Sequence, residues 1–136
     1  MRFLIIVKAT AESEAGAMHE ETLIPQMAGF HEELAKTGAL LDASGLLPSA
    51  SGWRIRYDGT KHTVVEGPFD TLETLVSGYT LIQARTREEA LEWTNRFPNP
   101  RGDGLPAEIE VRPLHGLDDF PPPEAVERFR ELGVED

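Results

Sequence analysis

Two carboxylates occupy positions where the chain could fix a side chain for acid–base chemistry. Glu66 ends an extended stretch and is followed by the rigid corner Gly67-Pro68, while Asp42 interrupts the apolar run ALLDASG. A carboxylate that is desolvated in a cleft titrates at a higher pH than usual, which suits proton transfer. We therefore predict Glu66 and Asp42 as catalytic candidates. The alternative is structural: the corner brings Phe69 into the core, and Asp42 faces water.

His31 is the third catalytic candidate, because it falls on a segment expected to form a helix beside the cleft. The ordinary pKa of an imidazole lies close to neutral pH, so this side chain could take up and release a proton. His31 also follows Phe30 and precedes two glutamates, so the alternative is an ordinary residue at the edge of an apolar stripe. The chain has no cysteine, and none of its four histidines forms a His-x-His or His-x₃-His pair. We therefore predict no metal site and no bound cofactor.

A basic strand face supplies the candidate ligand-binding groups. Arg54 and Arg56 alternate with the apolar residues of the run WRIRY, which places both arginines on one face. This face is either solvated, with surface ion pairs of small energetic weight, or it turns into a cavity. In a cavity, a guanidinium could bind a carboxylate or phosphate through two hydrogen bonds. The predicted ligand-binding residues are Arg54, Arg56, Phe69 and Tyr79.

Short runs of β-branched and aromatic residues predict the strands that must carry these side chains. Residues 107–112 show the clearest alternation of apolar and charged side chains, and Asp58-Gly59 marks the turn of a hairpin. The predicted strands cover residues 2–8, 39–47, 53–57, 62–66, 78–84 and 107–112.

Apolar residues at helical spacing predict two helices that cross between strands. The stripe of the first helix is formed by Leu23, Met27, Phe30 and Leu34. The second begins after the capping residue Thr86, and its stripe is formed by Ala90, Trp93, Thr94 and Phe97. Residues 11–22 read as a loop or short helical turn, residues 69–77 as a short helix, and an amphipathic tail helix follows Pro121–Pro123.

The order of these elements is β–α–β–hairpin–β–α–β, with right-handed crossovers. The simplest arrangement is an α+β, ferredoxin-like βαββαβ fold with an inserted hairpin, in which both helices cover one face of a mostly antiparallel sheet. The other sheet face is then left bare. A bare face of this kind tends to be buried against a second copy, so we predict a homodimer.

The composition limits the partners and the location. The 13 Lys and Arg against 24 Asp and Glu give a net charge of −11, which repels nucleic acid and anionic membrane surfaces, so we predict neither as a partner. The lack of cysteine suits the cytoplasm, and the apolar run from Phe3 to Val7 is too short for a signal peptide or a membrane span. A chain of 136 residues is expected to form one domain, residues 1–120, followed by the tail helix in residues 121–136.

Five segments, in order, resemble the DGPF subgroup of the YCII-related family. They are MRFLIIVKATAESEAG, HEELAKTGALLDASGLLPS, VVEGPFDTLETLVSGYTLIQ, REEALEWTNRFPNP and IEVRPL. The resemblance extends from about residue 1 to about residue 120. It implies a dimeric α/β barrel built from ferredoxin-like subunits, with a cleft between sheet and helices. It also implies small-molecule binding or chemistry, although most members of the subgroup have no assigned reaction.

The chain departs from the family at the residues that carry chemistry elsewhere. Distant YCII relatives, including a dehalogenating one, are enzymes that use a His/Asp pair. The resemblance places that histidine near Met27 and that aspartate near Asn99, so the pair is not carried over. The name-giving Asp-Gly-Pro-Phe reads Glu66-Gly67-Pro68-Phe69 here, and the lysine that usually follows is missing.

Three classes of function follow from these observations. The first is a homodimeric domain that binds a small molecule and has no assigned activity. The second is an acid–base enzyme of isomerase, lyase or dehalogenase type, which acts on a small organic acid through Glu66, Asp42 or His31. The third is a protein-interaction module, in which the dimer face or the tail helix binds a partner. The sequence leaves open whether the chain is an enzyme.

Overall fold

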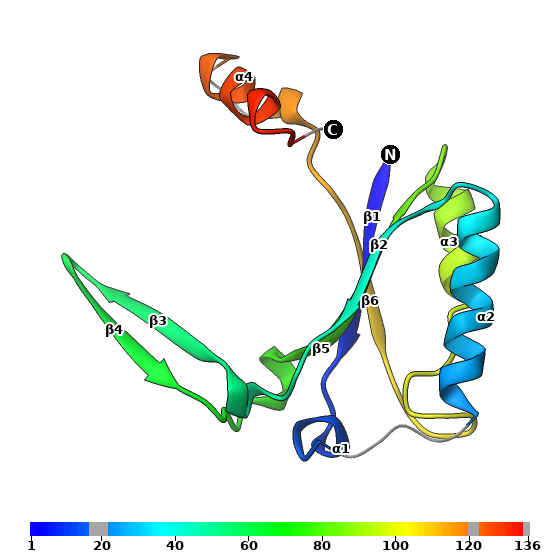
Figure 1. Cartoon of the computed structure of the whole chain (residues 1–136), viewed down its shortest axis with the longest axis horizontal. Helices are drawn as coiled ribbons and strands as arrows, with labels where there is room; N and C mark the ends of the chain where they lie inside the picture. Colours follow the sequence, from blue (N-terminus) through cyan, green and yellow to red (C-terminus); the bar gives the residue numbers. More distant parts are fainter. Residues whose placement is uncertain (17–21, 120–122, 135–136) are drawn as a thin grey trace.

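The chain folds around a four-stranded antiparallel sheet (Figure 1). The structure is a computed structural model that describes residues 1–16, 22–119 and 123–134. The strands lie in the order β2-β5-β1-β6, and β5 joins the edge strand β2 to the central strand β1. Their bounds are β1 Arg2–Lys8, β2 Leu40–Gly45, β5 Val76–Gln83 and β6 Ile109–Pro113.

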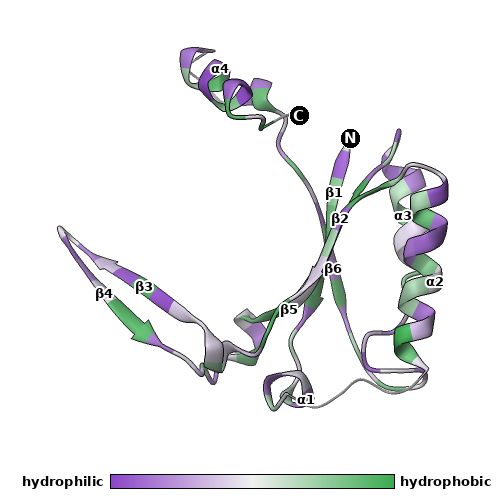
Figure 2. Cartoon of the chain, in the orientation of Figure 1, coloured by the Kyte–Doolittle hydropathy of each residue, from purple (hydrophilic) through white to green (hydrophobic). Residues whose placement is uncertain are grey.

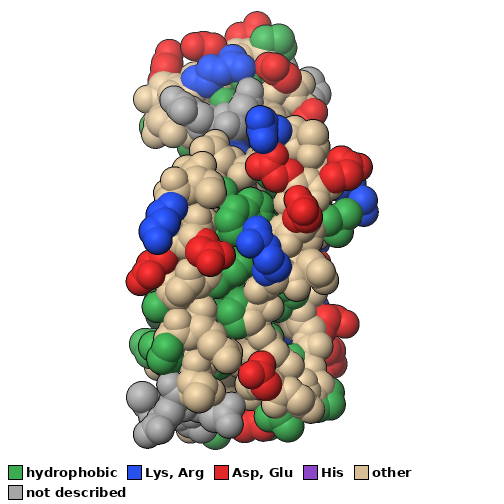
Figure 3. Space-filling model, turned by 90° about the vertical axis from the view of Figure 1, so that its right-hand side faces the viewer, with side chains coloured by type: hydrophobic (Ala, Val, Ile, Leu, Met, Phe, Trp, Pro, Cys, Tyr) green, Lys and Arg blue, Asp and Glu red, His purple; other side chains and the backbone are tan. Residues whose placement is uncertain are grey.

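Two helices, α2 (Leu23–Lys36) and α3 (Arg87–Asn95), cover the same face of the sheet (Figure 1). The segment between β1 and β2 contains α2, and α3 connects β5 to β6, so the order of the main elements is the predicted one. The outer surface on this side carries charged side chains of both signs (Figure 3). The expected α+β class, with helices on one face of an antiparallel sheet, is confirmed.

The core lies between these helices and the buried face of the sheet. Ile5 of β1 and Ile82 of β5 are fully buried and pack with Phe30 and Leu34 of α2. The ring of Phe30 meets the ring of Trp93 edge to face, with 6.2 Å between their centroids. The apolar stripes read from the sequence therefore face the core in both helices.

The start of α3 forms as its sequence predicts. The Thr86 hydroxyl accepts a hydrogen bond of 3.1 Å from the Glu89 backbone N–H, which satisfies one of the free donors at a helix start. Glu88 and Glu89 lie in the first turn, where the helix dipole favours negative charge.

The remaining elements lie at the ends of the sheet. They are α1 (Ala11–Glu14), the hairpin strands β3 (Trp53–Asp58) and β4 (Lys61–Glu66), the 3₁₀ turns η1 (Ser49–Ser51), η2 (Leu72–Thr74) and η3 (Leu117–Asp119), and α4 (Pro123–Glu131). The predicted hairpin and tail helix are thus present. The parts of these predictions that concern residues 17–21 and 120–122 lie outside the described residues. No helix in the described part of the chain is long and apolar enough to cross a lipid bilayer.

The helix predicted over residues 69–77 is wrong, apart from the single turn η2. The Thr71 and Thr74 hydroxyls lie 2.9 Å apart, and the Thr74 hydroxyl donates to the Thr71 carbonyl over 2.8 Å. Such local bonds compete with helical ones and favour turns. The chain then enters β5 at Val76, two residues before the predicted strand begins.

Replacing Trp93 with Ala should lower the free energy of unfolding by about 3–5 kcal/mol, because the substitution leaves a cavity in the core. The indole is 8% exposed, and the Arg96 guanidinium stacks on it at 4.2 Å from the ring centroid. Leu91→Ala is the matched control on the same helix, since Leu91 is 50% exposed; its cost should stay below about 1 kcal/mol. Denaturant unfolding measures both, and equal costs would contradict the assigned core.

Candidate functional site

A cavity of about 710 Å³ lies between the sheet and the first turns of α2. Its walls come from α1, α2, β1, β2, β5 and the loop of residues 97–105. The lining is mainly apolar on the α2 side, with Leu23, Ile24, Met27 and Ala28. The cavity therefore lies between the sheet and α2, where the family resemblance implies a cleft.

The cavity exists because the sheet carries small side chains at this end. Ala43 lies opposite Thr80 and Gly45 lies opposite Gly78 in the β2–β5 ladder. Residues directly opposite in an antiparallel pair share a face, and Thr80 shares its face with the buried Ile82 through the alternation of β5. Where Ile82 fills the space under α2, the glycine pair leaves it empty.

His31 is the polar group at which α2 and the sheet meet in this cavity. Its Nδ1 lies 2.7 Å from the Met27 carbonyl oxygen and its Nε2 lies 2.8 Å from the Thr80 hydroxyl. Because a carbonyl oxygen can only accept, Nδ1 carries a proton. In the neutral ring Nε2 is then an acceptor and the Thr80 hydroxyl donates to it. Thr80 is 2% exposed, so this contact is shielded from water.

Charged groups at the rim of the cavity are already paired. Lys8 Nζ lies 3.2 Å from Glu110 Oε1, and Arg101 Nη2 lies 3.0 Å from Glu12 Oε1. The hydrogen bond from Lys8, with a second from Arg112, holds the pKa of the Glu110 carboxyl below its ordinary value. A backbone hydrogen bond at Glu12 and the Arg101 guanidinium likewise lower the pKa of Glu12. The cations are therefore balanced by carboxylates, and no free cation at these two positions draws an anion into the cavity.

Tyr79 and Asp42 meet on the other face of the sheet. Tyr79 borders the cavity, but the alternation of β5 turns its side chain away from Gly78 and Thr80. Its hydroxyl donates to Asp42 Oδ2 over 2.9 Å, and the Ala43 backbone N–H donates to Asp42 Oδ1 over 2.8 Å. Asp42 is exposed. Its carboxylate therefore faces water and is not desolvated in a cleft.

The corner after β4 does not reach the cavity. Glu66 is exposed and is absent from the cavity lining, so the expectation that it faces a cleft beside the first helix is not met. Gly67 packs so closely on η1 that a Cβ at this position would lie 1.9 Å from the Ser49 carbonyl oxygen. The Gly67 N–H donates to the Gly52 carbonyl over 2.9 Å. Glycine is required here because only backbone fits.

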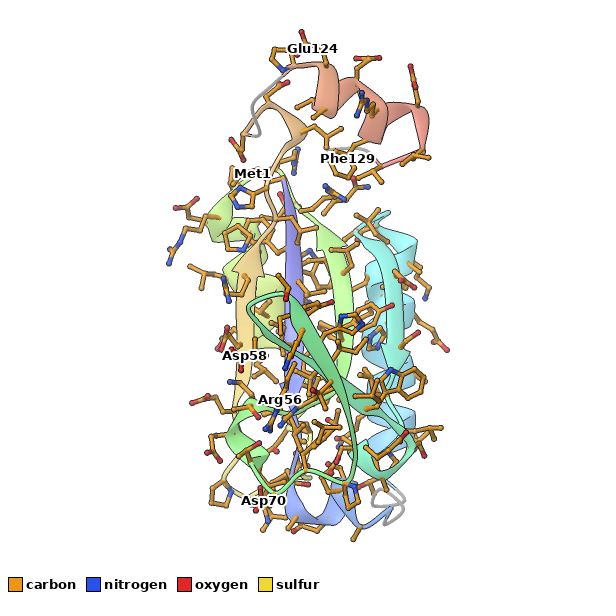
Figure 4. All side chains as sticks on the ribbon, turned by 90° about the vertical axis from the view of Figure 1, so that its left-hand side faces the viewer. Met1, Arg56, Asp58, Asp70, Glu124 and Phe129 are labelled. Atoms are coloured by element: carbon orange, nitrogen blue, oxygen red, sulfur yellow. The ribbon has the colours of Figure 1, made fainter. Side chains whose placement is uncertain are left out.

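Arg54 and Phe69 contact each other beside this corner and not in the cavity. The Arg54 guanidinium lies 3.9 Å from the centroid of the Phe69 ring, and it donates to the Thr71 and Thr74 hydroxyls over 3.4 and 3.2 Å. These contacts tie β3 to the segment before β5. Arg56 is exposed on the hairpin, which lies in front of the open sheet face in the view of Figure 4.

A chain of hydrogen bonds connects the corner to α1 at the edge of the cavity. The Phe69 N–H donates to the Ser49 hydroxyl oxygen over 3.0 Å. The Ser49 hydroxyl donates in turn to one carboxylate oxygen of Glu14, and the Ser49 N–H donates to the other over 2.9 Å. On the other side of α1, Glu12 is paired with Arg101. The helix that borders the cavity is therefore held from two directions.

Comparison with known proteins places the chain in a family. A model of the YCII-related domain matches residues 1–115. The chain belongs to the YCII-related family. No curated protein matches the sequence significantly. Among solved structures, the chain is similar to 5-chloro-2-hydroxyhydroquinone dehydrochlorinase of Burkholderia phenoliruptrix in complex with 2,5-dihydroxybenzoquinone, at 17% identity and a TM-score of 0.41, over 85% of this chain and 95% of that one.

In this YCII-related chain, the structure brings only some of the predicted site residues together. His31 and Tyr79 border the cavity, whereas Glu66, Asp42, Arg54, Arg56 and Phe69 do not. Sequence reasoning missed Thr80 and Ser49. A threonine in the middle of an otherwise buried strand face was the available signal for Thr80. Among the described residues, no three His, Cys, Asp or Glu side chains form a group that could hold a metal ion.

Gly67→Ala should destabilise this YCII-related chain by about 1–3 kcal/mol or more, because the new methyl group meets a backbone oxygen that cannot move aside cheaply. Gly45→Ala is the matched control, since a Cβ there approaches nothing closer than 4.0 Å. Thermal or denaturant unfolding of both variants measures the difference. Equal stabilities would show that the corner does not pack on Ser49.

Proposed function

We propose that this chain is a homodimeric domain that binds a small organic molecule in the cavity between α2 and the sheet. The observation that carries the proposal is His31, whose two ring nitrogens are fixed by Met27 and Thr80 at the wall of a largely apolar cavity. Concave, mostly apolar sites with a few placed polar groups are typical of small-molecule binding. A volume of about 710 Å³ suits a metabolite and is too small for a macromolecule.

The walls indicate the kind of ligand. The α2 side offers aliphatic contacts from Leu23, Ile24 and Met27. The Thr80 hydroxyl, which donates to His31 Nε2, can still accept a hydrogen bond from a ligand hydroxyl. The cations Lys8 and Arg101 are occupied by carboxylates. We therefore favour a compact, largely apolar molecule with a hydroxyl or a similar hydrogen-bond donor over a multiply charged anion.

An acid–base enzyme is the second candidate, because His31 can be satisfied in both protonation states. When the ring is neutral, Nε2 accepts from the Thr80 hydroxyl; when it is protonated, Nε2 donates and the same hydroxyl accepts. A proton could thus pass from a bound molecule to His31 through the Thr80 hydroxyl, which gives its own proton to Nε2 and takes one from the molecule, and the reverse transfer returns it. In this reading His31 is the acid–base residue and Tyr79 is the predicted ligand-binding residue that borders the same cavity. Glu66 and Asp42 are the competing catalytic candidates, and Arg54, Arg56 and Phe69 are the predicted ligand-binding groups of a site outside this cavity.

We propose that the same chain is a ferredoxin-like, cytoplasmic member of the DGPF subgroup. The strand order and helix placement support a ferredoxin-like βαββαβ subunit with an inserted hairpin, and the Glu66-Gly67-Pro68-Phe69 corner supports the DGPF subgroup of the family. The lack of cysteine supports a cytoplasmic protein. We also retain a domain of residues 1–120 and a separate tail helix as the expected division of the chain.

The exposed surface supports the homodimer of the α/β-barrel type. A compact monomer of this mass exposes about 7,100 Å², whereas this chain exposes 9769 Å². The difference of about 2,700 Å² is comparable with what a subunit buries in a large obligate dimer interface. The sheet face opposite α2 and α3 carries Leu4, Ile6 and Leu81 by strand alternation, and it is the natural place for the second copy.

Light scattering at micromolar concentration should give about twice the chain mass of 15.1 kDa. The physical reason is the uncovered sheet face together with the excess surface. A single species at the chain mass across the whole concentration range would contradict the homodimer.

The ligand site is tested first by a thermal-shift screen of small phenols, alcohols and weak organic acids, and then by variants with the best hit. His31→Gln should weaken binding by about tenfold, because a flexible amide cannot orient the Thr80 hydroxyl as the imidazole held by Met27 and Thr80 does. Ala28→Trp should abolish binding by filling the cavity. Glu66→Gln should change the affinity by less than about twofold, since Glu66 lies outside the lining.

The opposite ranking of the two polar variants would transfer the role to Glu66 and overturn the assignment of His31. Unchanged binding by Ala28→Trp would place the ligand outside the cavity. His62→Gln serves as the control for a histidine substitution, because His62 is exposed on the hairpin.

A further inference from the structure

The hairpin β3–β4 exposes an apolar face that neither the cavity nor the core uses. Trp53 pairs with Glu66, Ile55 with Val64, and Tyr57 with His62, so these six side chains share one face of the hairpin. Trp53 is 62% exposed, Tyr57 78% and Val64 55%. We call this set the arm face. Four large apolar side chains in adjacent positions form a patch of the kind that marks an interaction site.

The hairpin gains little support from the rest of its own chain. Its two strands form a sheet of their own and pack chiefly on each other. The hairpin projects from the lower end of the sheet, on the side opposite α2 and α3 (Figure 1). Part of β4 is hydrophobic (Figure 2). An isolated two-stranded hairpin is only marginally stable in water, so an arm of this length needs a surface to pack on.

We propose that the hairpin is a dimerisation arm whose arm face packs on a second copy of this chain. The inference deepens the proposed homodimer and rests on it. The hairpin and α4 project on the same side as the open sheet face (Figures 1 and 4). A second copy seated on that face lies between these two projections, and the two-fold symmetry of a dimer places its own arm against the first chain.

The exposed area of the chain supports a second copy as the occupant, and the charge of the hairpin does not oppose it. The segment from Trp53 to Glu66 holds three cationic and two anionic side chains, a net charge of +1, whereas the whole chain carries −11. The rest of the chain therefore carries −12. Arg54 and Arg56 lie on the hairpin face opposite the arm face, which itself carries no Lys or Arg. The hairpin as a whole therefore adds little repulsion to its contact with another acidic copy. The excess surface of about 2,700 Å² is also larger than the area of about 800 Å² that each partner buries in a standard interface. A standard interface on the sheet face alone would therefore leave much of this excess uncovered.

The absence of cysteine from the sequence allows a direct test with two single-cysteine variants. Val64→Cys probes the arm face, and Thr63→Cys probes the opposite face one residue away; both side chains are exposed in the single chain and both substitutions keep the size of the side chain. The rate of maleimide labelling is measured across the concentration range of dimer formation, which light scattering follows on the same samples. Labelling of Val64→Cys should slow by about tenfold as the dimer forms, because access controls the reaction, while Thr63→Cys changes by less than about twofold.

A second pair of variants tests the contribution of the arm to affinity. Val64→Glu should raise the dimer dissociation constant by at least about tenfold, since it buries a charge, and Thr63→Glu should leave it within about twofold of the wild type. A dimer with equal, concentration-independent labelling at both cysteines and equal effects of both glutamates would overturn the arm and leave the homodimer standing. A wild-type chain that stays monomeric would overturn both.

Discussion

Helix α2 packs on the buried face of the sheet, where the side chains of β5 decrease in size from Ile82 through Thr80 to Gly78. At the Ile82 end the helix packs with Phe30 and Leu34 and closes the core. At the Gly78 end the sheet offers no side chain, so the same helix bridges a cavity. The packing of one helix on the sheet therefore creates both the filled core and the cavity beside it. Thr80 stands at the transition, and its hydroxyl binds His31 there.

The supports of the cavity come from distant parts of the chain. Gly67 approaches the backbone of η1 so closely that the position tolerates no side chain. Ser49 of η1 binds the Phe69 N–H and the Glu14 carboxylate, and Glu14 belongs to the short helix beside the cavity. A four-residue helix has little stability of its own, so these contacts and the Glu12–Arg101 pair are what hold it in place. The Glu66-Gly67-Pro68-Phe69 corner is thus explained as a scaffold.

Much of the fold could be predicted from the sequence because its signals are local. The stripe from Leu23 to Leu34, the Thr86 cap and the Asp58-Gly59 turn each depend on residues that are close in the sequence, and each forms as predicted. The helix predicted over residues 69–77 is wrong because the Thr71 and Thr74 hydroxyls form local hydrogen bonds. The spacing of apolar residues does not reveal such bonds.

The site was harder to predict because it depends on contacts between distant residues. His31 could be chosen from its type and helix, but its partner Thr80 lies 49 residues away. Glu66 looked functional because a rigid corner follows it. The corner is rigid for another reason: it packs on Ser49, and this fixes the backbone without directing the carboxylate to the cavity. The sequence shows that a position is constrained and does not show which neighbour constrains it.

Strand β5 serves both surfaces to which we assign function. Gly78 and Thr80 form the floor of the cavity, while Tyr79 and Leu81, the residues in between, face the open side where we place the second copy. The hydrogen bond from Tyr79 to Asp42 joins β5 to the edge strand β2 on that open side. Because the side chains of one strand alternate between its faces, β5 cannot tilt or slide to suit one occupant without moving the residues that meet the other. The proposed ligand site and the proposed dimer interface therefore share one strand, whose position is fixed by the ladder of β2, β5 and β1.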